Sequence, residues 1–119
     1  MKCLHIITPV KDSIDSTLET VKAIMESDIL VPFTYTVYND FSTEENTHRL
    51  EEAARQWNFR LVNLSDLTDH PSPNYLLVLQ TAQKEAIEAD AGLLIVESDV
   101  IVKKNTLQSL YNGALQQKQ

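Results

Sequence analysis

The sequence predicts an α/β fold, a three-layer α/β/α sandwich with a mostly parallel sheet in the middle. Short apolar runs typical of buried strands alternate along the 119 residues with segments whose apolar side chains recur at helical spacing. This strand-then-helix order repeats along the whole chain, which implies right-handed crossovers between parallel strands. There is no internal repeat and no low-complexity segment, so we expect residues 1–119 to form a single domain.

Each expected strand has its own signature. Residues 3–8 (CLHIIT) form a mostly apolar run without strict alternation, which is typical of a strand covered on both faces; His5 within it is expected to be a core residue. Residues 33–38 are all aromatic or β-branched. Residues 59–64 largely alternate between apolar and polar, and residues 92–96 (GLLIV) are wholly apolar.

The segments after the strands are expected to be amphipathic helices. Asp12, Ser13 and Ser16 are candidate N-caps of the first helix. Ser16 with Glu19, and Ser42 with Glu45, have the spacing of capping boxes at the starts of the first two helices. A third helix is expected over about 74–89, and a fourth near the C-terminus. The apolar residues that define the four helices are Ile14, Leu18, Val21 and Met25; Leu50, Ala53, Ala54 and Trp57; Leu79, Ala82 and Ala86; and Leu107, Leu110, Tyr111 and Ala114.

Composition excludes several classes of protein. The 10 basic residues against 17 acidic ones give a net charge of -7, which repels a phosphate backbone, so we expect no nucleic-acid partner. The two glycines lie far apart, which excludes the Gly-rich dinucleotide and phosphate loops. No stretch approaches the ~20 apolar residues of a membrane span. With Cys3 as the only cysteine no intrachain disulfide is possible, and we expect a cytoplasmic protein.

Polar residues gather where the predicted strands end, and ligands of open parallel sheets bind beyond the carboxyl ends of the strands. Glu97 and Asp99 follow the last strand directly and stand two residues apart, so both point the same way if the chain stays extended. Such a pair suits Mg²⁺ or Mn²⁺ that already carries a diphosphate. The alternative is that both are ordinary acidic residues at the place where a strand meets water.

Asn39 and Asp40 end the second predicted strand. Asp40 could simply join the turn, or favour the positive N-terminal end of the helix that Ser42 caps. That explanation does not say why a carboxylate should share this edge of the sheet with Glu97. A carboxylate there could instead accept a hydrogen bond from an N–H group of a ligand's base. On the residues alone, both interpretations stay open.

Three stretches together resemble the landmarks of family 2 glycosyltransferases, which have the GT-A fold. They are IITPVKD near the N-terminus, VYNDFSTEENT at the end of the second strand, and LLIVESDVIV at the fourth. The family patterns run near I-I-P-x-Y-N, V-D-D-G-S-T-D-x-T and F-L-D-x-D-D, in the same order and at similar spacing, across about the first 105 residues. Asn39 stands in place of the first aspartate of the D-D pair.

The resemblance implies a nucleotide-diphospho-sugar donor bound with a divalent metal, Mn²⁺ or Mg²⁺. Asp40 falls on the aspartate that binds the nucleobase. Thr8 and Pro9 fall where the end of the first strand lines the base pocket. Glu97 and Asp99 fall on the motif that binds the metal and the diphosphate.

The same resemblance implies that the chain supplies only the donor-binding half of such an enzyme, in a truncated GT-A fold. In the family, the acceptor site and the general base lie mainly beyond the metal motif, so no catalytic residue is assigned in this sequence. The implied reaction is a displacement at the anomeric carbon, in which the metal offsets charge on the departing nucleoside diphosphate.

Two other functions stay open. A receiver-like phospho-acceptor module has a similar length and acidic strand ends, but it needs a cluster of acids after the first strand and a fifth strand that carries a lysine. The sequence predicts neither. A non-catalytic interaction or oligomerisation module of the same fold, such as a homo-oligomer built on an exposed sheet edge, is the other.

Overall fold

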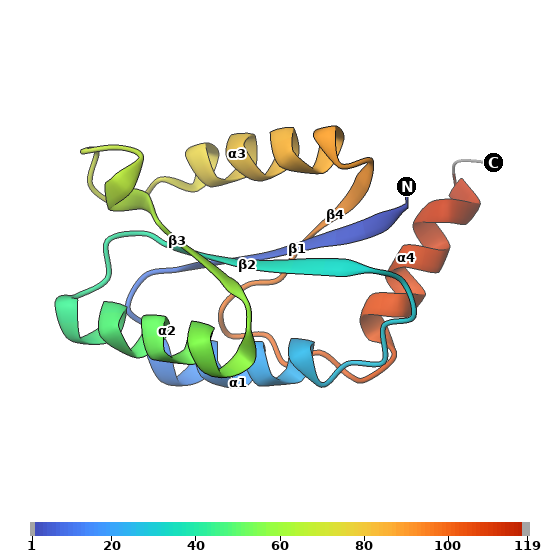
Figure 1. Ribbon diagram of the computed structural model, residues 1–119, viewed down its shortest axis with the longest axis horizontal. Helices are drawn as coiled ribbons and strands as arrows, with labels where there is room; N and C mark the ends of the chain where they lie inside the picture. Colours follow the sequence, from blue (N-terminus) through green and yellow to red (C-terminus); the bar gives the residue numbers. More distant parts are fainter. Residues whose placement is uncertain (1, 118–119) are drawn as a thin grey trace.

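The computed structural model describes residues 2–117, which form the α/β/α sandwich that the sequence predicts (Figure 1). Its strands are β1 (Cys3–Val10), β2 (Phe33–Asn39), β3 (Arg60–Asn63) and β4 (Ala91–Ile95). They form one sheet in the order β3-β2-β1-β4, with every strand pair parallel. In receiver-type sheets the first strand lies between the second and the third. Here β1 lies between β2 and β4, so the topology argues against the receiver-like alternative.

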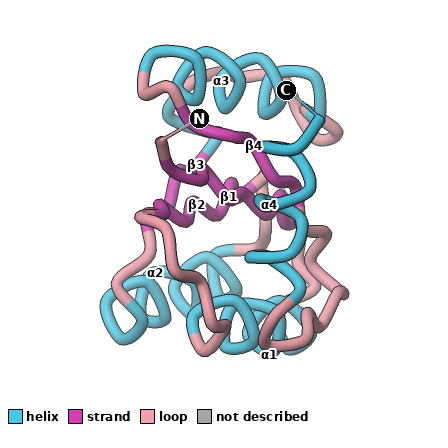
Figure 2. The backbone as a smooth tube through the Cα atoms, turned by 90° about the vertical axis from the view of Figure 1, so that its right-hand side faces the viewer, coloured by secondary structure: helices cyan, strands magenta, loops and turns pink. Residues whose placement is uncertain are grey.

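Helices cover both faces of the sheet (Figures 1 and 2). The helices α1 (Ile14–Met25) and α2 (Glu44–Trp57) lie side by side on one face. The helix α3 (Tyr75–Glu88) lies on the opposite face, after a short 3₁₀ turn, η1 (Leu64–Asp66). None of the helices in the described part of the chain is both long and apolar enough to cross a membrane.

Strand side chains alternate between two apolar cores, one on each face of the sheet. The larger core joins β1 and β2 to α1 and α2, and the smaller one lies beneath α3. A fourth helix, α4 (Thr106–Gln117), belongs to the larger core because Leu107, which is only 1% exposed, packs there. Representative residues are Leu4, Ile6, Val37 and Leu50 in the larger core, and Ile7, Tyr38, Val78 and Ala82 in the smaller one.

The strand register brings the carboxyl ends of β1, β2 and β4 to one edge of the sheet. Val10 at the end of β1 pairs with Asn39 at the end of β2. Just past the strands, the Asp40 N–H donates to the Val10 carbonyl at 2.8 Å, and the Val96 N–H donates to the Ile7 carbonyl at 2.9 Å. The segments that follow these three strands therefore meet, as the sequence predicts for a ligand site.

The prediction that Ser42 and Glu45 form a capping box at the start of α2 is wrong. The N-cap of α2 is Thr43, whose hydroxyl accepts from the Asn46 N–H at 3.3 Å. The Ser42 hydroxyl accepts instead from the backbone N–H of Asp12 at 2.8 Å. The Ser42 side chain thus bonds to the loop after β1, and not to the start of α2 as its spacing from Glu45 predicts.

The helix α1 begins after Ser13, one of the three candidate N-caps, and not at the predicted capping box of Ser16 and Glu19. Its first residue is Ile14 and its N-cap is Ser13, so Ser16 lies inside the helix, where its hydroxyl donates to the Ser13 carbonyl at 3.2 Å. The reason is the tight turn after β1, in which Asp12 has a positive φ of 65°. That turn delivers Ile14 into the larger core, where it is 6% exposed.

Candidate functional site

A cleft of about 240 Å³ opens at the carboxyl edge of the sheet. Pro9 in β1, Lys11 just after it, Asp40 after β2 and Glu97 after β4 all line this cleft. Ser72 and Pro73, just before α3, and Tyr75, the first residue of α3, also line it. Three of the residues that the sequence singles out, Pro9, Asp40 and Glu97, are therefore brought together.

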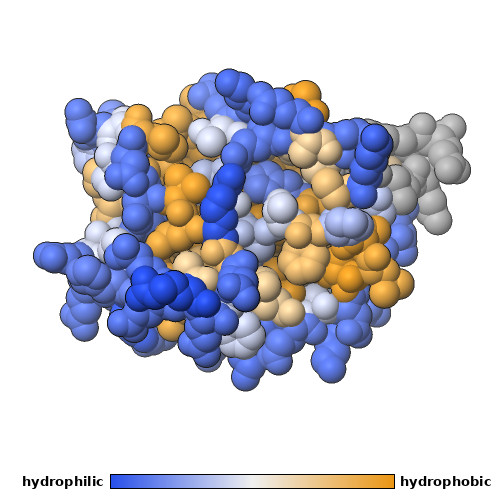
Figure 3. All heavy atoms as spheres, in the orientation of Figure 1, coloured by the Kyte–Doolittle hydropathy of each residue, from blue (hydrophilic) through white to orange (hydrophobic). Residues whose placement is uncertain are grey.

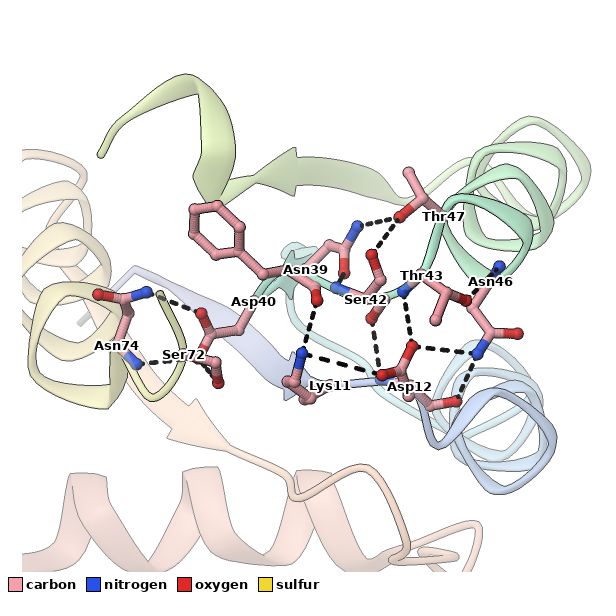
Figure 4. A network of polar contacts seen from close by, with 11 residues as sticks. Lys11, Asp12, Asn39, Asp40, Ser42, Thr43, Asn46, Thr47, Ser72 and Asn74 are labelled. Carbon is pink, nitrogen blue, oxygen red and sulfur yellow. Dashed lines mark hydrogen bonds and ion pairs between the residues drawn. The ribbon is translucent and has the colours of Figure 1, made fainter. Parts of the chain in front are cut away.

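The Asp40 carboxylate holds the segment before α3 in place (Figure 4). Its Oδ2 atom accepts from the Ser72 hydroxyl and from the Asn74 backbone N–H, each at 2.8 Å, and its Oδ1 atom accepts from the Asn74 side-chain amide at 2.8 Å. Asp40 is only 8% exposed. Burial by itself raises the pKa of Asp40, but the bonds from Asn74 and Ser72 outweigh it and hold this pKa below its usual value. The carboxylate is therefore ionised at neutral pH.

These bonds leave Asp40 with limited capacity for a ligand. A carboxylate has about four acceptor positions on its two oxygens. Oδ2 already accepts two bonds and Oδ1 accepts one. One position on Oδ1 therefore remains for a donor that enters the cleft.

The loops after β1 and β2 are bound to each other beside the cleft (Figure 4). The Asp12 carboxylate accepts from the Thr43 N–H at 2.7 Å and from the Asn46 amide at 3.2 Å. The Lys11 ammonium donates to the Phe41 carbonyl at 2.6 Å. The Thr43 bond is the main reason why the pKa of Asp12 is lowered, and this effect favours the charged form. These bonds hold the two loops together, and with them the two cleft residues Lys11 and Asp40.

Asn39, which replaces an aspartate of the family pattern, has a structural role. It is 3% exposed. Its amide donates to Thr47 and to Asn63, each at 2.9 Å, and its Oδ1 atom accepts from the Ser42 N–H at 3.1 Å. Asn39 therefore ties β2 to β3 and to α2, and does not line the cleft.

Glu97 and Asp99 lie on a turn, and not on the extended chain that the sequence argument assumed. The Val100 N–H donates to the Glu97 carbonyl at 3.2 Å, which closes a turn over Ser98 and Asp99. The buried Thr20 of α1 fixes this turn, because its hydroxyl donates to the Ser98 carbonyl at 3.1 Å. Glu97 lines the cleft, whereas Asp99 is exposed on the turn beside it.

The carboxylates of this turn fit a metal that arrives with its substrate. Within residues 2–117, no three His, Cys, Asp or Glu side chains are grouped so that they could hold a metal ion by themselves. Mg²⁺ is usually bound by one or two protein carboxylates, with phosphate oxygens and water completing the shell. Glu97 supplies one such carboxylate to the cleft and the exposed Asp99 follows two residues later, so the residues suit a metal that arrives with a diphosphate better than a bare ion.

Thr8 does not reach the cleft with its side chain. It is fully buried on the face of β1 opposite to Pro9, and its hydroxyl accepts from the Tyr35 hydroxyl at 2.8 Å. Alternation along β1 explains this, because neighbouring residues of a strand point to opposite faces. Any contribution of Thr8 to ligand binding is therefore made through its backbone.

Sequence reasoning missed Lys11, Ser72 and the contact of Asn74 with Asp40. The sequence did indicate a loop around Ser72 and a helix start at Asn74. No local pattern, however, connects that loop with a strand end more than thirty positions earlier. Only the folded chain shows this contact.

No known protein-family profile matches the sequence, and no curated protein matches it either. Solved structures do match. The structure of S. aureus TarS 1-349 in complex with UDP-GlcNAc aligns with a TM-score of 0.65 and 22% identity, over 98% of this chain and 32% of that one. The mannosyltransferase PcManGT from Pyrobaculum calidifontis, in complex with GDP-Man and Mn²⁺, aligns with a TM-score of 0.63 and 18% identity, over 90% of this chain and 30% of that one.

A third enzyme shows the same similarity. Glucosyl-3-phosphoglycerate synthase from Mycobacterium tuberculosis, in complex with Mn²⁺, UDP and glucosyl-3-phosphoglycerate, aligns with a TM-score of 0.62 and 16% identity. The alignment covers 96% of this chain and 40% of the synthase. The chain thus spans less than half the length of each of these three structures. It has the GT-A fold of these glycosyltransferases.

Proposed function

We propose that the chain is the donor-binding half of a glycosyltransferase and holds a nucleotide-diphospho-sugar together with Mn²⁺ or Mg²⁺. The observation that carries this proposal is the meeting of Pro9, Asp40 and Glu97 in one cleft, although they belong to three different strand ends. The fold supports it, because structures with this fold were solved with UDP-GlcNAc, with GDP-Man and Mn²⁺, and with UDP and Mn²⁺.

In this proposal the two sides of the cleft have different roles. The remaining acceptor position of Asp40 takes an N–H of the nucleobase, which lies against Pro9. Glu97, with Asp99 beside it, binds the metal that carries the diphosphate. Lys11 lines the same cleft and offsets part of the negative charge there.

The acceptor capacity of Asp40 favours uracil or thymine over guanine. Uracil and thymine present one ring N–H between two carbonyls, and the single remaining position on Oδ1 satisfies one N–H. Lys11 can donate to one of the neighbouring carbonyls. Guanine presents two adjacent N–H groups and needs a second acceptor. We therefore propose a uridine or thymidine diphosphate sugar as the donor.

The metal, when bound, acts as a Lewis acid that offsets charge on the departing nucleoside diphosphate. The residues of this chain bind and orient the donor: Asp40 fixes the base, and the turn at Glu97 fixes the diphosphate. Transfer also needs an acceptor site and a base that activates the acceptor hydroxyl. We assign neither to residues 2–117.

Isothermal titration calorimetry of the chain with UDP, with and without Mn²⁺, tests this proposal. We expect millimolar or tighter binding that strengthens when Mn²⁺ is present, and tighter binding of UDP than of GDP. Glu97→Gln should remove most of the Mn²⁺ effect. Asp69→Asn, a matched change at an exposed position of the loop before α3, should leave binding unchanged. No metal-dependent binding of UDP, dTDP or GDP at millimolar concentration would refute the donor site.

We also propose, as a second and non-catalytic role, pairing between copies of the chain along β4. This strand lies at the edge of the sheet, and Ile95 at its end is 38% exposed. An open strand edge is a ready template for pairing with another chain. Sedimentation equilibrium should then show a dimer at micromolar concentration, and a stable monomer would count against this role.

A further inference from the structure

The inward face of α1 carries two buried threonines. On the face of the molecule seen in Figure 3, hydrophilic residues cover much of the two outer helix layers, and apolar residues gather between them. Val21 and Ile24 of α1 accordingly pack into the larger core. Thr17 and Thr20 of the same helix are fully buried as well. Because a buried hydroxyl needs a hydrogen-bond partner, the acceptor of each threonine shows what its hydroxyl is for.

The two hydroxyls are satisfied in different ways. The Thr17 hydroxyl donates to the carbonyl of Ser13, the N-cap of α1, at 2.6 Å. The Thr20 hydroxyl lies 3.1 Å from the equivalent carbonyl, that of Ser16, and also 3.1 Å from the Ser98 carbonyl in the turn after β4. A hydroxyl has a single hydrogen, so Thr20 shares it between these two acceptors. Thr20 thus bonds to a second element, whereas the Thr17 bond stays within α1 and its cap.

The segment 97–101, which contains this turn, is anchored at both ends by apolar residues. Val96 before it is buried in the larger core, and Val102 after it packs against that core. Between these anchors, among the described residues, the bond from Thr20 to the Ser98 carbonyl is the one hydrogen bond that joins the segment to another element. Thr20 therefore fixes the backbone from which the carboxylates of the turn extend.

The helix α1 also holds the other side of the cleft. In the loop before α1, the Asp12 carboxylate accepts from the Thr43 N–H at 2.7 Å, in the loop that follows Asp40. The helix is thus joined near its start to the segment that carries Asp40, and at Thr20 to the turn that carries Glu97. Hydrogen bonds between successive turns make an α-helix stiff, so α1 keeps these two segments at a fixed separation.

We propose that Thr20 is a positioning residue for the metal of the donor site. Its hydroxyl holds the turn so that the Glu97 carboxylate, with Asp99 beside it, is in place when a metal arrives with the diphosphate. Thr20 itself touches neither the metal nor the nucleotide. Groups that hold metal ligands in place in this way typically change metal affinity by about 10–100-fold when they are removed. This inference rests on the proposed donor site, but it also predicts a property of the chain without any ligand.

Two variants of matched shape test the role of the hydroxyl. Thr20→Val removes the bond to the turn, and Thr17→Val removes a buried hydroxyl whose bond stays within α1 and its cap. Isothermal titration calorimetry gives the Kd of UDP with and without Mn²⁺ for each. We expect Thr20→Val to weaken UDP binding about tenfold when Mn²⁺ is present and to leave it unchanged without Mn²⁺. Thr17→Val should match the parent chain in both, and Thr20→Ser, which keeps a hydroxyl, should recover the binding.

NMR of the ¹⁵N-labelled chain without ligand provides the second readout. We expect Thr20→Val to lower the heteronuclear NOE of the Ser98, Asp99 and Val100 amides, because the turn becomes mobile, and Thr17→Val to leave it unchanged. The positioning role is overturned if the turn is as ordered in Thr20→Val as in Thr17→Val. It is also overturned if Thr20→Val keeps the full effect of Mn²⁺, or loses UDP affinity equally with and without Mn²⁺. A parent chain whose UDP binding shows no effect of Mn²⁺ refutes the donor site itself, even where the turn becomes mobile as expected.

Discussion

Replacing Asp40 with alanine should destabilise the chain by about 2–4 kcal/mol. The buried Asn74 N–H loses its acceptor, and an unsatisfied buried donor costs about 1–3 kcal/mol. The Ser72 hydroxyl and the Asn74 amide each lose one bond worth roughly 0.5–1.5 kcal/mol, part of which water restores, while the amide keeps its other bond, to the His70 carbonyl. Because a domain of this size is stable by only about 5–15 kcal/mol, the loss is easy to measure.

Urea unfolding followed by the fluorescence of Trp57, the single tryptophan, measures this free energy. Asp69→Ala removes an exposed aspartate from the same loop and should change the free energy of unfolding by less than about 0.5 kcal/mol. Ser72→Ala, which removes one of the three bonds, should fall between the two. If Asp40→Ala costs no more than Asp69→Ala, then the carboxylate does not hold the segment before α3, and the acceptor count on which the choice of base rests is wrong.

The remaining predictions concern the core and the pH dependence of stability. Thr8→Val should lower the free energy of unfolding in urea by about 1–3 kcal/mol, because the buried Tyr35 hydroxyl loses its acceptor. The affinity for UDP should not change; a large loss of affinity would show that the Thr8 side chain contacts the nucleotide. Leu107→Ala should cost about 2–5 kcal/mol, and a cost near zero would show that α4 does not pack on the larger core. Since the pKa of Asp40 is lowered by folding, the folded chain binds its proton less readily than the unfolded chain. Its contribution is therefore complete above about pH 4 and is lost as the pH falls further, so stability measured from pH 6 down to about pH 3 should fall less steeply in Asp40→Ala than in the parent chain.

The layers and the parallel sheet follow from the sequence because strand and helix signals are local. The run at residues 33–38 favours a strand by its own composition, and Leu50 with Ala53 defines the buried face of α2. Helix starts were less predictable. Ser42 and Ser16 each have the spacing of a cap, yet a loop contact with Asp12 and the burial of Ile14 decide where the helices begin.

The candidate site was predictable only in outline. Topology alone places Asp40 and Glu97 at one edge, because parallel strands end together. The bonds that use most of the Asp40 carboxylate come from Ser72 and Asn74, which no sequence pattern pairs with it. The turn at Asp99 likewise depends on a contact with α1 that is distant in sequence.

The most direct test of the donor site is where Mn²⁺ lies when UDP is bound. Mn²⁺ broadens the NMR signals of nearby amides, so a titration of the ¹⁵N-labelled chain with trace Mn²⁺, with and without UDP, locates the ion. We expect UDP to focus the broadening on the amides around Glu97, Asp99 and Lys11, while the amide of Ala91, at the other end of β4, stays sharp. Broadening that UDP does not change, or that centres away from the turn at Glu97, would contradict a metal–nucleotide site in this cleft.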